Sequence, residues 1–66
     1  MRDTTQLYFD YRKKAYDIMI MNNCPFSVAG ICGILHVNEN QIDMDIMRSA
    51  VLGALRDFNA RRLAHG

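Results

Sequence analysis

The sequence contains no tryptophan, a single proline and no unbroken apolar run longer than Ile18 to Met21. A helix that spans a bilayer needs about 20 apolar residues, so we expect no membrane segment. No alternating run of β-branched residues occurs, which argues against a sheet. Arg2 and Asp3 lead into an amphipathic stretch rather than the apolar stretch of a secretory signal. We therefore expect a cytoplasmic, all-α protein.

The sequence also lacks an excess of one charge, since its 8 Lys and Arg residues and 7 Asp and Glu residues give a net charge of +1. The chain as a whole is therefore not drawn to nucleic acid or anionic membranes. The two cysteines, Cys24 and Cys32, are expected as reduced thiols. With His36 and His65 they match no familiar zinc spacing, so we expect no metal and no other cofactor. A chain of 66 residues leaves little room for a substrate pocket, and we expect no catalytic residues and no enzyme activity.

Hydrophobic residues make up 50% of the chain, which is too many for a disordered segment. The length allows one domain, residues 1–66, with one small core. A core of this size is marginal, and a partner or a homodimer would supply the missing burial. The five methionines give adaptable apolar surface, which suits partner binding.

Apolar residues at helical spacing predict three helices. The first is expected over about 3–21, the second over about 28–35, and the third from near 38–41 to 62. Ser27 and Asn38 are the expected N-caps of the second and third helices. The predicted core positions are Leu7, Tyr8, Tyr11, Ala15, Ile18, Met19, Val28, Ile31, Cys32, Leu35, Ile42, Ile46, Met47, Ala50, Val51, Ala54, Leu55 and Phe58.

Glycines occur inside two of the predicted helices. Gly30 and Gly33 each cost about 1 kcal/mol relative to alanine, so each either permits close backbone approach or lies on an exposed face, and we favour close packing. Gly53 is a weak point of the third helix. Two basic clusters, Arg12-Lys13-Lys14 and the group of Arg56, Arg61 and Arg62, complete the pattern. The first cluster is expected to be a solvated face.

The stretch from Phe26 to Ile42 reads as a short helix, a tight turn and the start of another helix. It resembles the helix-turn-helix of small bacterial and phage regulators, and the order of helices is similar to a compact tri-helical or winged-helix regulator. The chain ends soon after the third helix, so we expect no β-wing. The resemblance implies a small DNA-binding transcriptional regulator of phage or mobile-element type, with the motif between Ser27 and about Arg56.

In such regulators the second helix of the motif lies in the major groove, and its first residues meet base edges. Asparagine and glutamine side chains can bind adenine, and arginines can hold the phosphate backbone. The resemblance therefore implies this DNA-contacting set: Asn38, Asn40, Gln41 and Met44 toward the bases, with Arg48 and Arg56 on the backbone.

The alternative hypothesis is a module of the same fold that binds and modulates another protein. His36 stands where the family has glycine in the turn. The acidic residues Glu39, Asp43 and Asp45 would face or flank phosphates, and acids at that place oppose DNA binding. From the sequence, the DNA and the protein hypotheses both remain open.

A second apolar stripe, Phe9, Tyr16 and Ile20, lies opposite the core face of the first helix. Exposed apolar patches usually mark interaction sites, and tyrosine is enriched at interfaces. We therefore expect a homodimer, or another protein contact, through the first helix.

Overall fold

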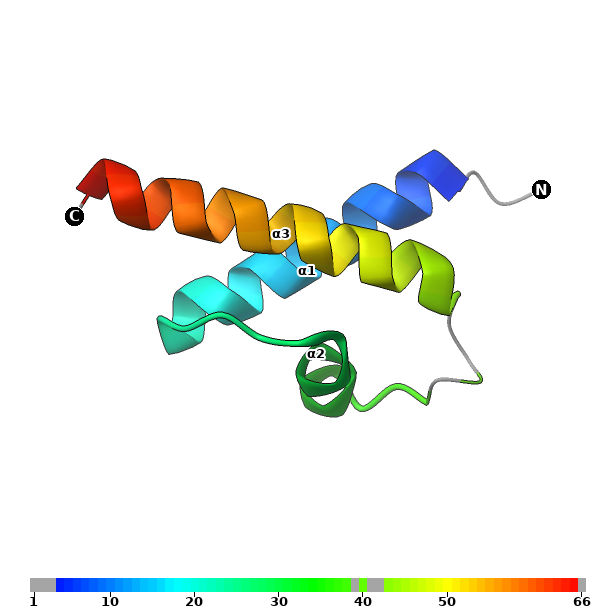
Figure 1. Ribbon diagram of the computed structural model, residues 1–66. Coiled ribbons are helices and arrows are strands. Elements are labelled where there is room, and N and C mark those ends of the chain that lie inside the picture. Colours follow the sequence, from blue (N-terminus) through cyan, green and yellow to red (C-terminus); the bar gives the residue numbers. More distant parts are fainter. Residues whose placement is uncertain (1–3, 39, 41–42, 66) are drawn as a thin grey trace.

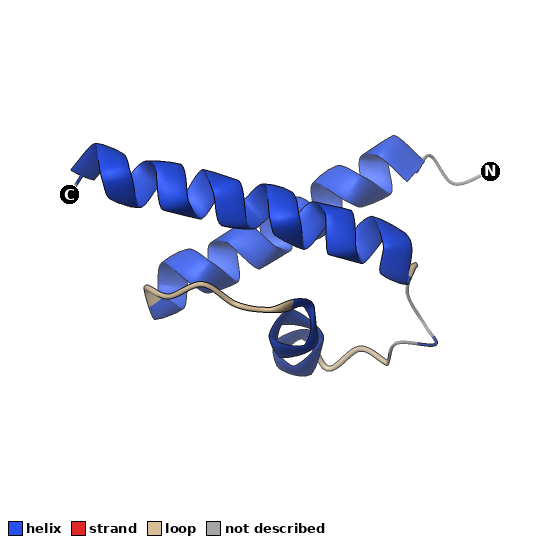
Figure 2. Cartoon of the chain, in the orientation of Figure 1, coloured by secondary structure: helices blue, strands red, loops and turns tan. Residues whose placement is uncertain are grey.

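The computed structural model describes residues 4–38, 40 and 43–65, which form three helices. Helix α1 spans Thr4–Asn22, α2 spans Val28–Leu35 and α3 spans Met44–His65. The described residues contain no strand, as Figure 2 shows. The prediction of an all-α fold with three helices is therefore confirmed.

The two long helices, α1 and α3, cross each other, and the short α2 lies beneath the crossing (Figure 1). Three contacts between α1 and α3 are spaced four residues apart on both helices. They pair Tyr8 with Gly53, Arg12 with Asp57, and Tyr16 with Arg61. Both numbers rise together, so α1 and α3 run in the same direction. The chain returns between them through residues 23–43, which contain α2.

The core lies where the three helices meet. Its buried side chains come from α1 (Ala15, Ile18, Met19), from α2 (Ile31, Cys32) and from α3 (Met47, Ala50, Val51, Ala54, Phe58). Each of them belongs to the set predicted from helical spacing. The apolar periodicity of the sequence therefore identified the buried faces correctly.

Helix α1 ends at Asn22, and the next residue, Asn23, has a left-handed backbone with φ of 53°. The N–H of Asn23 donates to the carbonyl of Ile20 at 3.2 Å, and the N–H of Cys24 donates to the carbonyl of Met19 at 3.2 Å. These two bonds form a Schellman motif, which satisfies carbonyls that the helix end leaves free. Asparagine suits this place because it tolerates the left-handed region better than most residues.

Helix α2 has the N-cap that the sequence predicted. The Ser27 hydroxyl accepts a hydrogen bond from the N–H of Gly30 at 3.2 Å. At the other end His36 is left-handed with φ of 56°, and its N–H is directed at the carbonyls of Cys32 and Gly33. His36 therefore has a backbone conformation that glycine favours.

The predicted start of the third helix is wrong, because α3 begins at Met44 rather than near 38–41. The capping residue is Asp43 instead of Asn38. The Asp43 carboxylate accepts from the N–H of Ile46 at 3.3 Å, and its carbonyl accepts from the N–H of Met47 at 2.9 Å. Residues 36–43 connect α2 to α3, which is longer than the turn of about three or four residues in a helix-turn-helix.

The glycines behave differently from one another. A Cβ at Gly30 would lie 3.0 Å from Cδ2 of Phe26, so close packing is confirmed there. A Cβ at Gly33 would meet nothing within 4 Å, so the prediction of close packing is wrong at that position. At Gly53 a Cβ would lie 2.8 Å from the Tyr8 hydroxyl. This glycine lets α1 approach α3.

Candidate functional site

The described residues proposed to meet DNA bases lie in the connection before α3 and at the first residue of that helix. Asn38 and Asn40 are exposed in the connection before α3. Gln41 lies outside the described residues, as do Glu39 and Ile42. Met44 is the first residue of α3, and its side chain packs partly against the core.

The proposed backbone contacts, Arg48 and Arg56, are both exposed on α3. Arg48 lies 3.7 Å from the carboxylate of Asp45 one turn earlier, and that carboxylate is 94% exposed. Asp43, which caps α3, is exposed as well. The N-terminal end of α3 therefore combines one arginine with two exposed acids, a mixture that weakens attraction to phosphate.

Arg12 is partly buried, so the expectation that the cluster Arg12-Lys13-Lys14 is a solvated face is wrong for this residue. Its Nε and Nη2 donate to the two carboxylate oxygens of Asp57 at 2.9 Å each, and its Nη1 donates to the Tyr8 hydroxyl at 3.1 Å. These hydrogen bonds raise the pKa of Arg12 above its ordinary value, with the Asp57 bond as the largest cause. Lys13 and Lys14 remain exposed on α1.

The second basic cluster stays accessible at the other end of α3. Arg56, Arg61 and Arg62 are all exposed. Arg61 donates through Nη1 to the Tyr16 hydroxyl at 3.3 Å, and the guanidinium carbon of Arg62 lies 5.9 Å from the centre of the Phe58 ring. Asp57 is the one acid over residues 56–65 of α3, and it forms an ion pair with Arg12. The C-terminal third of α3 therefore presents positive charge that no acid on the same helix compensates.

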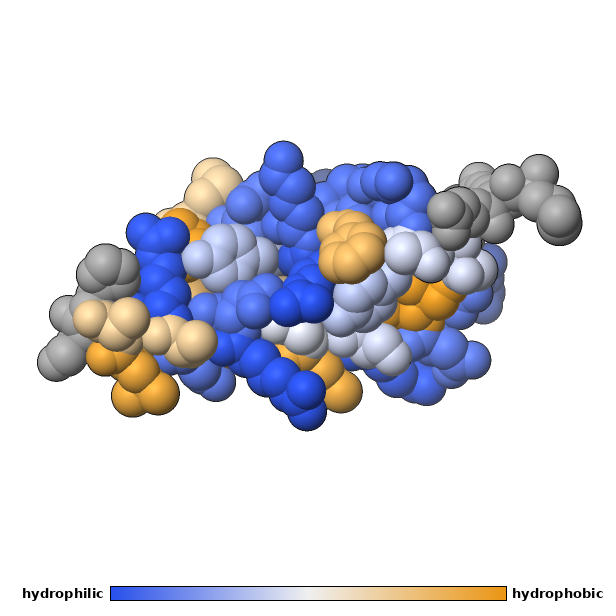
Figure 3. Space-filling view, turned by 90° about the horizontal axis from the view of Figure 1, so that it is seen from above, coloured by the Kyte–Doolittle hydropathy of each residue, from blue (hydrophilic) through white to orange (hydrophobic). Residues whose placement is uncertain are grey.

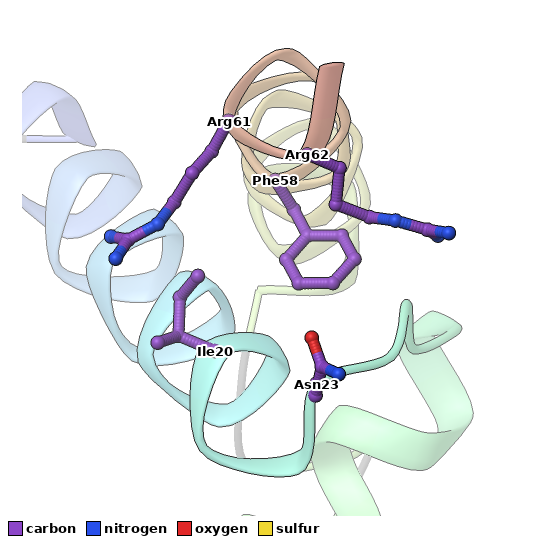
Figure 4. A pocket seen from close by; sticks show the side chains of 5 residues that line it. All are labelled: Ile20, Asn23, Phe58, Arg61 and Arg62. Carbon is purple, nitrogen blue, oxygen red and sulfur yellow. The ribbon is translucent and has the colours of Figure 1, made fainter. Parts of the chain in front are cut away.

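A cleft of about 290 Å³ opens beside these arginines, between the end of α1 and α3. Ile20 and Asn23 line it from the α1 side, and Phe58, Arg61 and Arg62 line it from α3. Figure 4 shows the Phe58 ring facing the cleft above Asn23, with Arg61 and Arg62 extending to opposite sides of it. The cleft thus combines an apolar floor with a cationic rim.

A second hollow of about 410 Å³ adjoins the first, because both are lined by Arg62. Its other lining residues are Asn59 and Leu63, and Leu63 is 84% exposed. In the space-filling view of Figure 3 the surface is largely hydrophilic, with separate apolar patches that include the end bearing the C-terminus. We call the surface made by Ile20, Asn23, Phe58, Asn59, Arg61, Arg62 and Leu63 the α3-end surface.

The three residues proposed as a dimer or partner face have different environments. Tyr16 and Ile20 are partly buried and pack against the core. Phe9 is 54% exposed, and its ring meets the Tyr8 ring edge-on at 5.3 Å between centres. A hollow of about 450 Å³ beside Phe9 is lined from α1 and from α3, where Asp45 and Ile46 contribute. The expectation that the stripe lies outside the core is therefore wrong for Tyr16 and Ile20. Of the three residues, only Phe9 lies outside it.

Cys24 is exposed and Cys32 is buried, and among the described residues neither forms a disulfide. Among the described residues no group of three or more His, Cys, Asp and Glu side chains is placed to hold a metal ion. In the same part of the chain, none of the helices combines the length and the apolar character that crossing a membrane requires.

No protein family, no curated protein and no solved structure was found to match this chain. The surface itself therefore provides the basis for a functional proposal.

Sequence reasoning grouped Arg61 and Arg62 as basic residues but missed the cleft beside them. One signal was available: both follow Phe58 by one helical turn, so they share a side of the helix with a core residue. Ile20 of α1 and Asn23, which directly follows that helix, join them only because α1 and α3 run in the same direction, and nothing in the local sequence specifies that direction.

Proposed function

We propose that this chain is a protein-interaction module that binds its partner through the α3-end surface. The observation that supports the proposal most strongly is that α3 continues past the core. Phe58 is the last buried residue among those whose burial the structure describes, and residues 59–64 are exposed. Apart from contacts such as the hydrogen bond of Arg61 to Tyr16, this end of the helix has little burial to stabilise it, so a partner that packs against it would add stability.

Exposed apolar side chains support the same proposal. Leu63 and Met21 are each 84% exposed, and Met21 directly follows the cleft residue Ile20. Burying apolar surface yields about 25 cal/mol per Å², so covering such side chains favours association. Arginine beside apolar residues is also the composition enriched at protein interfaces.

Site-specific photo-crosslinking tests this function. A photoreactive amino acid replaces Leu63 in cells that naturally produce the chain, and the same amino acid replaces Lys14 as a matched exposed control on α1. We expect a discrete protein adduct from position 63 and none from position 14. If position 63 yields no protein adduct while the variant remains folded, the proposal fails.

Duplex DNA binding is the second candidate, and the three exposed arginines Arg56, Arg61 and Arg62 favour it. In this candidate α2 and α3 would be the two helices of the helix-turn-helix that the sequence resembles, as in a phage-type regulator. The contacts would lie on the second half of α3, away from the exposed acids Asp43 and Asp45.

Phosphate binding releases counterions, so affinity for DNA must fall steeply as salt rises. Binding of a duplex at two salt concentrations is therefore the test. Removal of the three arginines should reduce the salt slope, and removal of Lys13 and Lys14 serves as the control of similar charge. Absence of salt-sensitive binding at micromolar protein removes this candidate.

A further inference from the structure

We infer that the cleft at the end of α3 binds a segment of a partner protein in which one apolar side chain is flanked on both sides by carboxylates. This inference rests on the protein-interaction function proposed above and gives the partner its chemistry. It follows from the floor of the cleft, its rim, its charge surroundings and its extent.

The floor of the cleft is apolar and continuous with the core. Phe58 is 1% exposed and belongs to the core cluster, and Ile20 packs against that cluster from α1. Because Phe58 is almost fully covered, an apolar side chain in the cleft would rest mainly on the partly exposed Ile20 and extend the core outward. Asn23 adds an amide that can pair with the backbone of a bound segment.

The rim places one cation on each side of that floor. Arg61 and Arg62 are adjacent in sequence, yet their side chains extend to opposite sides of the Phe58 ring (Figure 4). A guanidinium has five donors, and among the described residues Arg61 donates one hydrogen bond, to Tyr16. Both arginines therefore keep donors in the fork geometry that binds carboxylates in a bidentate manner.

None of the residues that line the cleft is an acid, and the nearest acid along α1 is Asp17, one helical turn before Ile20. The sequence has no Asp or Glu over residues 18–38 or 58–66, which include every residue that lines the cleft. Asp57 precedes Phe58, but both of its carboxylate oxygens accept from Arg12. Complementary charge must therefore come from the partner, and its carboxylates would meet the two arginines while its apolar side chain lies between them.

The extent of the surface favours a protein segment over a small carboxylic acid. The cleft of about 290 Å³ shares Arg62 with the hollow of about 410 Å³ that Asn59 and Leu63 also line. A small acid would leave the exposed Leu63 uncovered. An extended segment or a helix covers the cleft, Arg62 and Leu63 together.

Three short synthetic peptides test the inference. The first has a leucine between pairs of aspartates in a glycine and serine background. The second has serine in place of the leucine, and the third has asparagine in place of the aspartates. Binding is followed by NMR of the ¹⁵N-labelled chain, in which the signals of Asn23, Phe58 and Arg62 report on the cleft.

We expect the first peptide to shift these signals and the other two to bind about tenfold more weakly, since each lacks one half of the complementarity. The double variant R61Q and R62Q should weaken the first peptide by about the same factor. The double variant K13Q and K14Q removes the same charge from α1 and should leave binding unchanged. Melting curves of both variants establish that each remains folded.

Several results would overturn the inference. One is equal binding of the leucine and serine peptides, which would mean that charge alone is recognised. Another is a single-stranded oligonucleotide of matched charge that shifts the same signals at lower concentration than the first peptide. A third is the absence of shifts at millimolar peptide. A protein adduct from position 63 alongside that third result would leave the proposed function standing and remove only this partner chemistry.

Discussion

Arg12 in α1 and Asp57 in α3 form a two-pronged ion pair across the crossing of the long helices. The guanidinium donates from Nε to Oδ2 and from Nη2 to Oδ1, both at 2.9 Å. The same guanidinium donates to the Tyr8 hydroxyl, which lies beside Gly53. Bidentate geometry of this kind fixes the direction of both partners. The pair therefore fixes the register between two helices that run in the same direction.

Breaking this pair should weaken the fold more than breaking the exposed pair on α3. A double-mutant cycle with R12Q and D57N measures the coupling in urea, and a cycle with R48Q and D45N is its matched control. We expect larger coupling for Arg12 and Asp57, because their side chains are 32% and 44% exposed, against 63% and 94% for Arg48 and Asp45. Equal coupling in the two cycles would contradict a role for the pair in setting the register.

Two glycine substitutions should differ in their effect on stability. Gly33→Ala should raise the free energy of unfolding by about 0.5–1 kcal/mol, since alanine favours the helix and the added Cβ meets open space. Gly53→Ala should gain less, because its Cβ would lie 2.8 Å from the Tyr8 hydroxyl and 3.1 Å from Nε of Arg12, so the ends of these two flexible side chains must shift. Chemical denaturation of both variants compares the two changes. A gain for Gly53→Ala that equals or exceeds the gain for Gly33→Ala would show that this shift costs nothing.

Replacing His36 with glycine should stabilise the fold. With φ of 56° it occupies a region that costs an L-residue about 1 kcal/mol, so His36→Gly should raise the free energy of unfolding by about that amount. Asn23→Gly, at φ of 53°, should gain less, because asparagine already tolerates this conformation. Thermal melts of the two variants beside the unchanged chain compare them directly. A gain at position 23 that exceeds the gain at position 36 would contradict this account.

Phe9 is the residue on which the proposed homodimer through α1 now depends. The unchanged chain should sediment as a dimer at high micromolar concentration, and Phe9→Lys should sediment as a folded monomer, since Phe9 is 54% exposed and lies outside the core. Leu52→Lys is the control, because Leu52 is 59% exposed on α3 and should leave the dimer intact. A monomer at that concentration in the unchanged chain would remove the dimer.

Local sequence determined the helices and their buried faces. The apolar positions repeat at the helical period, and this period gave residues such as Met19, Ile31 and Phe58 as core before their contacts were known. The Ser27 cap was predictable for the same reason, since a hydroxyl before a helix meets free N–H groups within three residues. Such features depend on neighbours in the chain, which the sequence displays directly.

Tertiary structure alone decided how the helices meet. The parallel course of α1 and α3 pairs residues 45 positions apart, so neither the Arg12–Asp57 pair nor the Arg61–Tyr16 contact leaves a local pattern. The start of α3 also escaped prediction, because Asn38 and Asp43 are both competent caps and packing of the following helix selects between them. The α3-end surface exists for the same physical reason: long-range packing brings the end of α1 beside Phe58, and the arginines that follow Phe58 then frame a cleft.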